Sequence, residues 1–158
     1  DTIDLAIIGA FYWKGRRAGR YGTFLLAAYD KDHDTFRTAT KVGTGFTDED
    51  LENFPKLLQP YKVGHIHPRV DSKIEANVWF TPQIVIEVIA SEITLSPIHT
   101  CGIDAVRKGS GLALRFPKYT GKIRYDKAPE DATTTVEIIE MYRAQLKKIE
   151  EKPAVEGG

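Results

Sequence analysis

Residues 3–42, IDLAIIGAFYWKGRRAGRYGTFLLAAYDKDHDTFRTATKV, contain three segments with the composition of β-strands. The segments 3–13, 23–30 and 35–42 are rich in β-branched and aromatic residues, which favour a pleated, half-buried surface. The basic segment 14–22 carries three glycines and is typical of a loop. A link of only four residues, KDHD, predicts that the second and third strands form a hairpin.

A helix is predicted after these strands. Thr47 has the side chain of a helix N-cap, and the acids at 48–50 suit the positive end of the helix dipole. An apolar stripe follows at helical spacing, and Pro55 is expected to kink or divide this short helix. The stripe consists of Leu51, Phe54 and Leu58.

Two further strands are predicted in the second half of the chain. The segment 78–95, VWFTPQIVIEVIASEITL, indicates a short strand, a break at Pro82 and then a long buried strand. The pieces 111–116 and 122–126 are predicted to flank a turn at 117–121.

The predicted order is three strands, a helix and two strands, which is the order of an OB-fold. We therefore expect a mainly β domain over 1–134, a five-stranded Greek-key barrel with its helix between strands three and four. Residues 135–158 are predicted to add a C-terminal amphipathic α-helix and tail, opened by a capping box of Thr134 and Glu137. The helix could pack on its own barrel or on a neighbouring domain. Its predicted apolar face consists of Val136, Ile139, Tyr142, Leu146 and Ile149.

The composition is that of an ordinary globular chain of one domain, with 42% hydrophobic and 28% charged residues among 158. No apolar run has the length of a membrane span, so no membrane partner is expected. The single cysteine excludes an internal disulfide and fits a reducing compartment. The chain starts at Asp1 and its one methionine is Met141, so we expect it to be part of a longer protein.

The formal net charge is zero, but the charges are segregated along the chain. Two stretches, 5–28 and 105–125, contain no acid. Such basic stretches on a neutral chain predict a face that binds a polyanion. The first contains Lys14, Arg16, Arg17 and Arg20; the second contains Arg107, Lys108, Arg115, Lys118, Lys122 and Arg124.

The second stretch gives the more specific prediction. Arg115 beside Phe116 pairs a cation with a flat ring, which suits the edge of a nucleic-acid groove. Alternation along an extended strand would put Lys122, Arg124 and Asp126 on one face, where the cations could hold phosphates. A zinc site is a weaker alternative, formed by His65, His67, His99 and Cys101.

Four segments together resemble the C-terminal OB domain of ATP-dependent DNA ligases of the archaeal and eukaryotic type. They cover most of residues 1–134 in the order and spacing of that family, and the last resembles its sixth nucleotidyltransferase motif. The segments are IIGAFYWKGRRAGRYGTFLLAAYD (7–30), KVGTGFTDEDL (41–51), VWFTPQIVIEVIASEITLSPIHT (78–100) and LRFPKYTGKIRYDKAPEDATT (114–134).

The resemblance implies a role in sealing nicks in three steps, in which a lysine is adenylylated by ATP, AMP passes to the 5′-phosphate, and the 3′-hydroxyl displaces AMP. The R-x-D-K element, here Arg124, Asp126 and Lys127, would close over ATP and orient its phosphates. In a second orientation the domain would meet the minor groove of nicked DNA. The residues implied for DNA binding are Arg115, Phe116, Lys118 and the basic loop residues Lys14, Arg16, Arg17 and Arg20.

The nucleophilic lysine of the family belongs to a lysine-x-aspartate-glycine motif in a preceding adenylation domain, and this chain has no such motif. We therefore expect the chain alone to be inactive and to bind neither ATP nor Mg²⁺ by itself, although the full-length enzyme would use both. The expected partners are nicked duplex DNA and the adenylation domain of the same parent. Sliding-clamp contacts in this family usually lie outside this domain. The expected location is the cytoplasm in an archaeon and the nucleus in a eukaryote.

Two other functions remain open at this point. The OB domain of an RNA ligase or mRNA capping enzyme shares the same chemistry, and a preference for GTP would favour it. A free-standing OB module would instead bind single strands by stacking bases on exposed aromatic rings.

Overall fold

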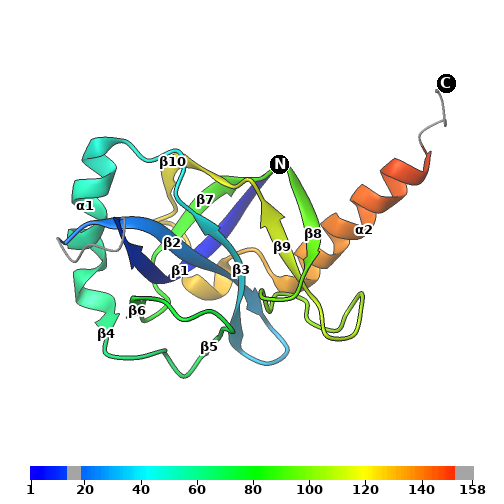
Figure 1. The fold of residues 1–158 in the computed structure, drawn as a ribbon, viewed down its shortest axis with the longest axis horizontal. Coiled ribbons are helices and arrows are strands. Elements are labelled where there is room, and N and C mark those ends of the chain that lie inside the picture. The colour runs from blue at the N-terminus through cyan, green and yellow to red at the C-terminus, as the bar shows by residue number, and fades with distance from the viewer. Residues whose placement is uncertain (14–18, 152–158) are drawn as a thin grey trace.

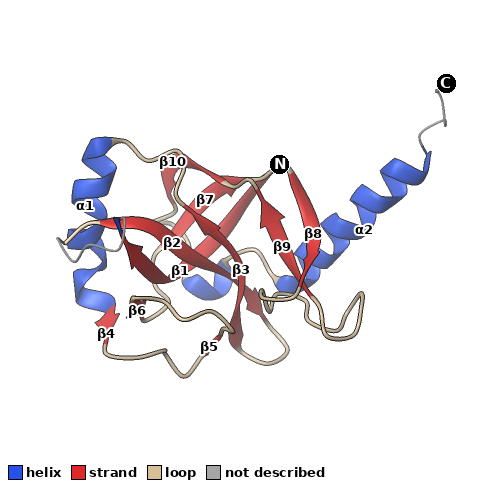
Figure 2. Ribbon diagram, in the orientation of Figure 1, coloured by secondary structure: helices blue, strands red, loops and turns tan. Residues whose placement is uncertain are grey.

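The computed structural model describes residues 1–13 and 19–151, and a curled antiparallel sheet forms its centre (Figures 1 and 2). The first three strands pair in sequence order, and the link at 31–34 closes the predicted hairpin between the second and third. These strands are β1 (Thr2–Tyr12), β2 (Tyr21–Asp30) and β3 (Thr35–Val42).

The last two barrel strands form one long hairpin that is interrupted in its middle. β8 pairs with β9, and β7 pairs with both β1 and β10. The pair Ile89–Lys118 continues the register of the pair Glu92–Arg115, so the hairpin keeps its alignment across the break. The strands are β7 (Val85–Ile89), β8 (Glu92–Ser96), β9 (Gly111–Arg115) and β10 (Lys118–Ile123).

Two details of this hairpin differ from the prediction. The predicted long strand is broken at residues 90–91, and the predicted turn at 117–121 is not a turn, because β10 already begins at Lys118. The interruption lies at Phe116, whose backbone φ of 54° is incompatible with a continuous strand. Gly121, with φ of 97°, lies within a bulge of β10 between Tyr119 and Ile123.

β9 returns to the side of β3 and completes a partly open barrel, in which no ladder of strand pairs joins β3 to β9 within the described residues. The Thr40 hydroxyl donates to the Leu114 carbonyl at 2.9 Å, and the Cys101 N–H donates to the Thr38 carbonyl at 2.9 Å. The interior is filled by buried aromatic and aliphatic side chains, among them Phe24, Phe54 and Tyr119. The chain has the mainly β OB-fold that its sequence predicts.

Helix α1 (Asp48–Leu58) follows β3 and begins as expected. Thr47 and Asp50 form a capping box, in which each side chain accepts a hydrogen bond from the backbone N–H of the other. Pro55 lies inside the helix and does not divide it, contrary to one of the predicted outcomes. The neighbouring Phe54 and the later Leu58 are both buried in the barrel core, and this packing offsets the backbone hydrogen bond that proline cannot make.

The segment after α1 covers the outer face of the sheet. It contains a 3₁₀ helix and three short strands, of which only the third, within residues 78–95, was predicted. Trp79 and Val70 pack with Ile8, Leu25 and Phe36 in a second hydrophobic cluster. Both faces of β1 and β2 are therefore buried. The elements are η2 (Gln59–Tyr61), β4 (Lys62–Val63), β5 (Val70–Asp71) and β6 (Val78–Phe80).

A 3₁₀ helix, η3 (Pro129–Asp131), precedes the C-terminal helix α2 (Thr135–Glu151). The predicted capping box is present, because Thr134 N–H donates to the Glu137 carboxylate at 2.8 Å and Glu137 N–H donates to the Thr134 hydroxyl at 3.1 Å. The buried face agrees with the predicted one in part: Tyr142 is buried and Ile139 packs against the core, but Ile138 is buried as well and Val136, Leu146 and Ile149 are exposed.

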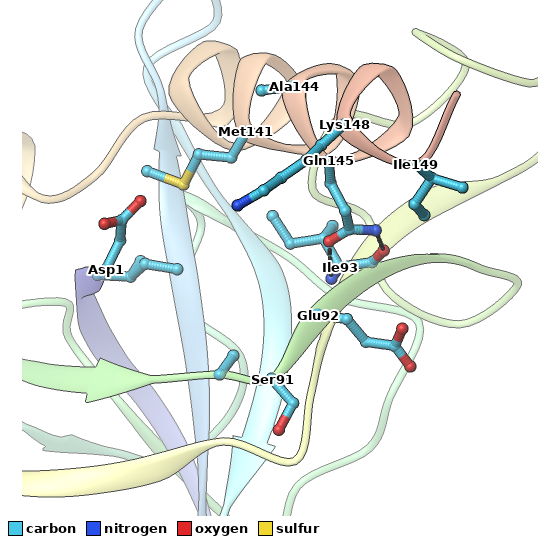
Figure 3. A pocket seen from close by; sticks show the side chains of 11 residues that line it. Asp1, Ser91, Glu92, Ile93, Met141, Ala144, Gln145, Lys148 and Ile149 are labelled. Atoms are coloured by element: carbon cyan, nitrogen blue, oxygen red, sulfur yellow. Dashed lines mark hydrogen bonds between the residues drawn. The ribbon is translucent and has the colours of Figure 1, made fainter. Parts of the chain in front are cut away.

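The helix packs on its own barrel, and its C-terminal part extends past the sheet (Figure 1). Gln145 fixes it to the edge of β8: its amide donates to the Ile93 carbonyl and its oxygen accepts from the Ile93 N–H, both at 2.8 Å (Figure 3). Ile149, in the last turn of α2, is exposed. Neither described α-helix combines the length and apolar character needed to cross a bilayer.

Candidate functional site

The end of β10 brings together the three residues of the R-x-D-K element. The strand ends at Ile123, and the Arg124 N–H donates to the Val85 carbonyl at 2.8 Å, which places Arg124 at the edge of β7. The chain then turns, and the Lys127 N–H donates back to the Arg124 carbonyl at 3.2 Å. The prediction of an extended strand through Asp126 is therefore wrong. A turn, and not strand alternation, gathers these side chains.

Arg124 and Asp126 form a two-point ion pair. The Arg124 Nε donates to one carboxylate oxygen at 3.1 Å and Nη2 donates to the other at 2.9 Å. This pairing lowers the pKa of Asp126 to about 2, with smaller contributions from its own backbone and from the charge of Lys122. It also raises the pKa of Arg124, so both groups are charged throughout the physiological range.

Asp4 on β1 is the fourth member of this cluster, and it was not among the predicted site residues. Its Oδ2 accepts hydrogen bonds from Arg124 Nη1 at 2.9 Å and from Lys127 Nζ at 2.8 Å. Asp4 is buried, and its contacts lie more than a hundred residues away along the chain. A carboxylate within a hydrophobic strand was the only signal in the sequence. We call Asp4, Arg124, Asp126 and Lys127 the β10-end cluster.

The second predicted group lies at the other end of β10. Phe116 is 68% exposed, and its φ of 54° is in the left-handed region that aromatic residues avoid. Pro117 follows it and further restricts its backbone. The Arg115 guanidinium lies 5.0 Å from the centre of the Phe116 ring. A strained backbone that holds an aromatic ring out in solvent is a feature typical of binding sites.

A groove of about 380 Å³ runs beside Phe116. Its lining comes from β3, β8 and β9 and includes two exposed cationic side chains, Lys41 and Arg115. Lys41 was not predicted as a site residue, because it lies outside the two acid-free basic stretches of the sequence. It becomes a candidate only once the barrel closes and sets β3 beside β9. We call this surface, formed by Lys41, Arg115 and Phe116, the Phe116 groove.

His99 lines the Phe116 groove from below the surface. The residue is only 6% exposed, and its Nδ1 has no hydrogen-bond partner among the described residues. Burial, together with the nearby charge of Lys41, lowers the pKa of His99 to about 4. The imidazole is therefore neutral near pH 7, and the cations of the groove are Lys41 and Arg115.

This burial predicts a pH dependence of stability. The unfolded histidine takes up a proton near pH 6.5, whereas the folded one does so only near pH 4. The contribution of His99 to the free energy of unfolding is therefore fully present above pH 6.5. It is lost as the pH falls towards 4, and the total loss is about 3 kcal/mol. The measurement is urea unfolding of wild type and His99→Gln at pH 7.5, 6, 5 and 4. The wild type should lose more stability than the variant, and parallel curves would contradict the assignment.

The basic loop between β1 and β2 is described only at its end. Lys14, Arg16 and Arg17 lie outside the described residues. Arg20 is exposed, and its carbonyl accepts a hydrogen bond from the Trp13 N–H at 3.1 Å, which extends the β1–β2 pairing. Lys118, the first residue of β10, is exposed as well.

The β10-end cluster and the Phe116 groove are separate sites. Six strand residues lie between Pro117 and Arg124, and a strand of that length spans roughly 15–20 Å when its bulge is considered. β10 itself is paired with β7 along the barrel (Figure 1). The domain thus carries two cationic sites at opposite ends of one strand.

The histidines do not gather with the cysteine. Among the described residues, no group of three or more histidine, cysteine or acidic side chains is arranged to hold a metal ion. His67 Nδ1 accepts a hydrogen bond from the Arg69 N–H at 3.1 Å. Cys101 is completely buried, and burial raises the pKa of its thiol to about 12.

A pocket of about 530 Å³ between α2 and β8 contains none of the predicted site residues (Figure 3). Its lining includes Ile3, Met141 and Ile149, with Lys148 as its cation. Its helix side is mixed, because Met141, Ala144 and Ile149 are apolar whereas Gln145 and Lys148 are polar.

The curled sheet and its helix define the chain as an OB-fold domain. The family described as "ATP dependent DNA ligase C terminal region" matches residues 17–127, and the chain belongs to this family. The chain is 60% identical over 147 residues to DNA ligase 2 of Thermofilum pendens, covering 93% of this chain and 24% of that protein. It is 62% identical to the DNA ligase of Pyrobaculum islandicum, with coverages of 93% and 25%.

The chain thus spans about a quarter of the length of the curated relatives it matches. Among solved structures it resembles the ligase domain of Mycobacterium tuberculosis LigD, with a TM-score of 0.61 and 22% identity. That match covers 84% of this chain and 38% of the other. At this identity the likeness concerns the fold.

Proposed function

We propose that this chain is the mobile OB domain of an ATP-dependent enzyme that seals nicks in duplex DNA. In this proposal the β10-end cluster binds the phosphates of ATP while a lysine of the enzyme is adenylylated. The Phe116 groove meets the DNA in the later steps. The observation that carries the proposal is the position of two different cationic sites at opposite ends of β10. A domain with this arrangement could rotate relative to the other domains of its parent and turn one of the two sites towards them at a time.

The β10-end cluster suits the first step, in which a lysine nitrogen attacks the α-phosphorus of ATP. The bond from that phosphorus to the bridging oxygen breaks, and pyrophosphate leaves with the electron pair. Arg124 and Lys127 would bind the departing phosphates and oppose their growing charge. The guanidinium fork suits two phosphate oxygens, and the ammonium group acts as a compact charge. The attacking lysine would belong to another domain of the parent.

The described residues do not fit a magnesium ion. The acids of the β10-end cluster, Asp4 and Asp126, are already occupied by Arg124 and Lys127, and no suitable group of acids occurs in the described part of the chain. A metal used in the reaction would therefore be held by ATP and by residues of the other domains.

The Phe116 groove suits the minor groove of DNA distorted at a nick. The exposed ring of Phe116 can pack against sugars or enter between bases, while Arg115, Lys41 and Lys118 neutralise phosphates. The left-handed backbone at Phe116 fixes the ring outward before DNA arrives, which reduces the ordering cost of binding. Arg20 and the basic loop would add contacts with further phosphates of the DNA backbone.

Phe116→Ala in the full-length parent is expected to weaken binding of nicked duplex about tenfold, because one aromatic contact with a base or sugar is lost. Charging of the enzyme with AMP should be unchanged. The measurements are fluorescence anisotropy with a nicked duplex and the rate of labelled enzyme–AMP formation.

Two controls accompany this variant. Phe116→Leu keeps the apolar volume and should retain part of the affinity, and Val136→Ala removes a similarly exposed apolar side chain on α2 and should have no effect. Equal affinity of Phe116→Ala and wild type for nicked DNA would contradict the assigned surface. Tighter binding to single strands than to nicked duplex would instead favour a single-strand-binding module.

A further inference from the structure

Asp4 has a rigid backbone. It lies in β1, paired with Glu87 of β7. Its N–H donates to the Thr133 hydroxyl at 3.0 Å, and its carbonyl accepts from the Thr133 N–H at 2.8 Å. Asp4 is therefore held by the sheet and by the segment that leads to α2. Its side chain therefore starts from a backbone that is hydrogen-bonded to Thr133 and paired within the sheet.

Its carboxylate holds both cations of the β10-end cluster at one point. Arg124 Nη1 and Lys127 Nζ donate to the same oxygen, Oδ2, so the two nitrogens lie within about 6 Å of each other. One phosphate group, or two neighbouring ones, could contact both cations at that separation. The second oxygen, Oδ1, is buried and has no hydrogen-bond partner among the described residues.

Asp126 differs from Asp4 in its exposure to water. The Asp126 side chain is 66% exposed, whereas that of Asp4 is 12% exposed. An exposed ion pair contributes little net stability, so a phosphate can replace Asp126 on Arg124 at small cost. Separating Asp4 from its partners would instead leave a charge in a largely dry site, which is costly. The two acids are therefore unequal: Asp126 is the exchangeable partner and Asp4 the permanent one.

We propose that Asp4 is a positioning residue for adenylylation, which fixes Arg124 and Lys127 side by side while ATP phosphates displace Asp126. This inference rests on the proposed function of the β10-end cluster. Asp4 itself touches no substrate. Its effect passes through the two cations, because it sets where they lie before ATP arrives.

The test is Asp4→Asn in the full-length parent, read as the single-turnover rate of AMP transfer from labelled ATP to the enzyme. The amide keeps the size of the side chain but loses the charge that gathers the cations. We expect the rate at saturating ATP to fall about tenfold, with a small change in the ATP concentration that gives half the maximal rate. In a parent that already carries Arg124→Ala and Lys127→Ala, Asp4→Asn should have no further effect.

The matched control is Asp30→Asn. Asp30 lies on β2 with a side chain that is also 12% exposed, and it accepts a hydrogen bond from Arg37 Nε at 2.6 Å. Its removal should lower the melting temperature without slowing AMP transfer. Should Asp4→Asn fail to fold, Asp4→Glu replaces it. The longer side chain displaces both cations, so we expect the same slowing of AMP transfer, and again no further effect when Arg124 and Lys127 are both alanine.

The outcomes separate the role of the cluster from the role of Asp4. If the parent with Arg124→Ala and Lys127→Ala accepts AMP from ATP as fast as wild type, the proposed function of the cluster is wrong. If AMP transfer is slow in that parent but proceeds at the wild-type rate in Asp4→Asn, only the role of Asp4 is wrong. A tenfold effect of Asp4→Asn that persists without the two cations would show a purely structural role and would also overturn the inference.

Discussion

Arg124→Ala in the full-length parent is expected to slow the transfer of AMP from ATP to the enzyme by about 10²–10³-fold, the usual effect of removing one preorganised donor at a developing charge. The guanidinium is held by Asp4, which stays its partner when ATP phosphates replace Asp126, so it needs little reorganisation when pyrophosphate begins to leave. The measurement is the rate of labelled enzyme–AMP formation in a single turnover.

Sealing of a nick that already carries AMP distinguishes this role from a general defect. That reaction omits the first step, so it should proceed nearly normally in the Arg124→Ala parent. Arg124→Lys should give an intermediate charging rate, because it keeps the charge and loses the fork. Arg143→Ala, which removes an exposed arginine on α2, is the matched control. An equal loss in charging and in sealing of the adenylylated nick would contradict the assigned step.

Gly45→Ala is expected to destabilise the domain by about 3–4 kcal/mol, from the sum of a left-handed backbone and a steric clash. Gly45 has a φ of 98°, and a Cβ there would lie 2.2 Å from the Tyr119 carbonyl oxygen in β10. Its neighbour Thr44 accepts a hydrogen bond from the Tyr119 N–H at 2.9 Å, and Phe46 stacks on the Tyr119 ring. The turn after β3 therefore fastens β10 to the barrel. For a chain of this size the melting temperature should fall by about 10 °C.

Two other glycines separate the causes. Gly121 has a φ of 97° but open space where an alanine methyl group would lie, so Gly121→Ala should cost only the backbone strain, about 1–2 kcal/mol. Gly64 has open space and no left-handed backbone, so Gly64→Ala should be nearly neutral. Thermal unfolding of the three variants should rank Gly45→Ala lowest. Equal melting temperatures for the Gly45 and Gly121 variants would show that β10 moves away from the added methyl group with no loss of stability, and would contradict the prediction.

Local patterns predicted the elements that depend on local chemistry. The strands within 3–42, the hairpin at 31–34 and the cap at Thr47 follow from alternation, link length and side-chain type, and all three were confirmed. The resemblance of four segments gave the family, which the match over residues 17–127 confirmed. The roles of individual site residues stay predictions.

Contacts between distant segments could not be predicted in this way. Asp4 reaches Arg124 only because β7 pairs with both β1 and β10, and no spacing in the sequence records that pairing. Lys41 joins Phe116 only when β9 closes against β3. The face of α2 was predicted only in part. Ile139 and Tyr142 pack on the barrel, but Val136 and Ile149 are exposed, because helical periodicity gives a stripe and does not say where the barrel ends.

The burial of Cys101 has a practical consequence for chemical labelling. It is the one cysteine of the chain, it lies wholly inside the barrel, and a thiol with a pKa of about 12 forms almost no reactive thiolate near neutral pH. Maleimide reagents should therefore leave the native chain unmodified. A cysteine introduced at an exposed position such as Val136 would then be the sole point of attachment, and a dye could be placed on the domain without replacing its natural thiol.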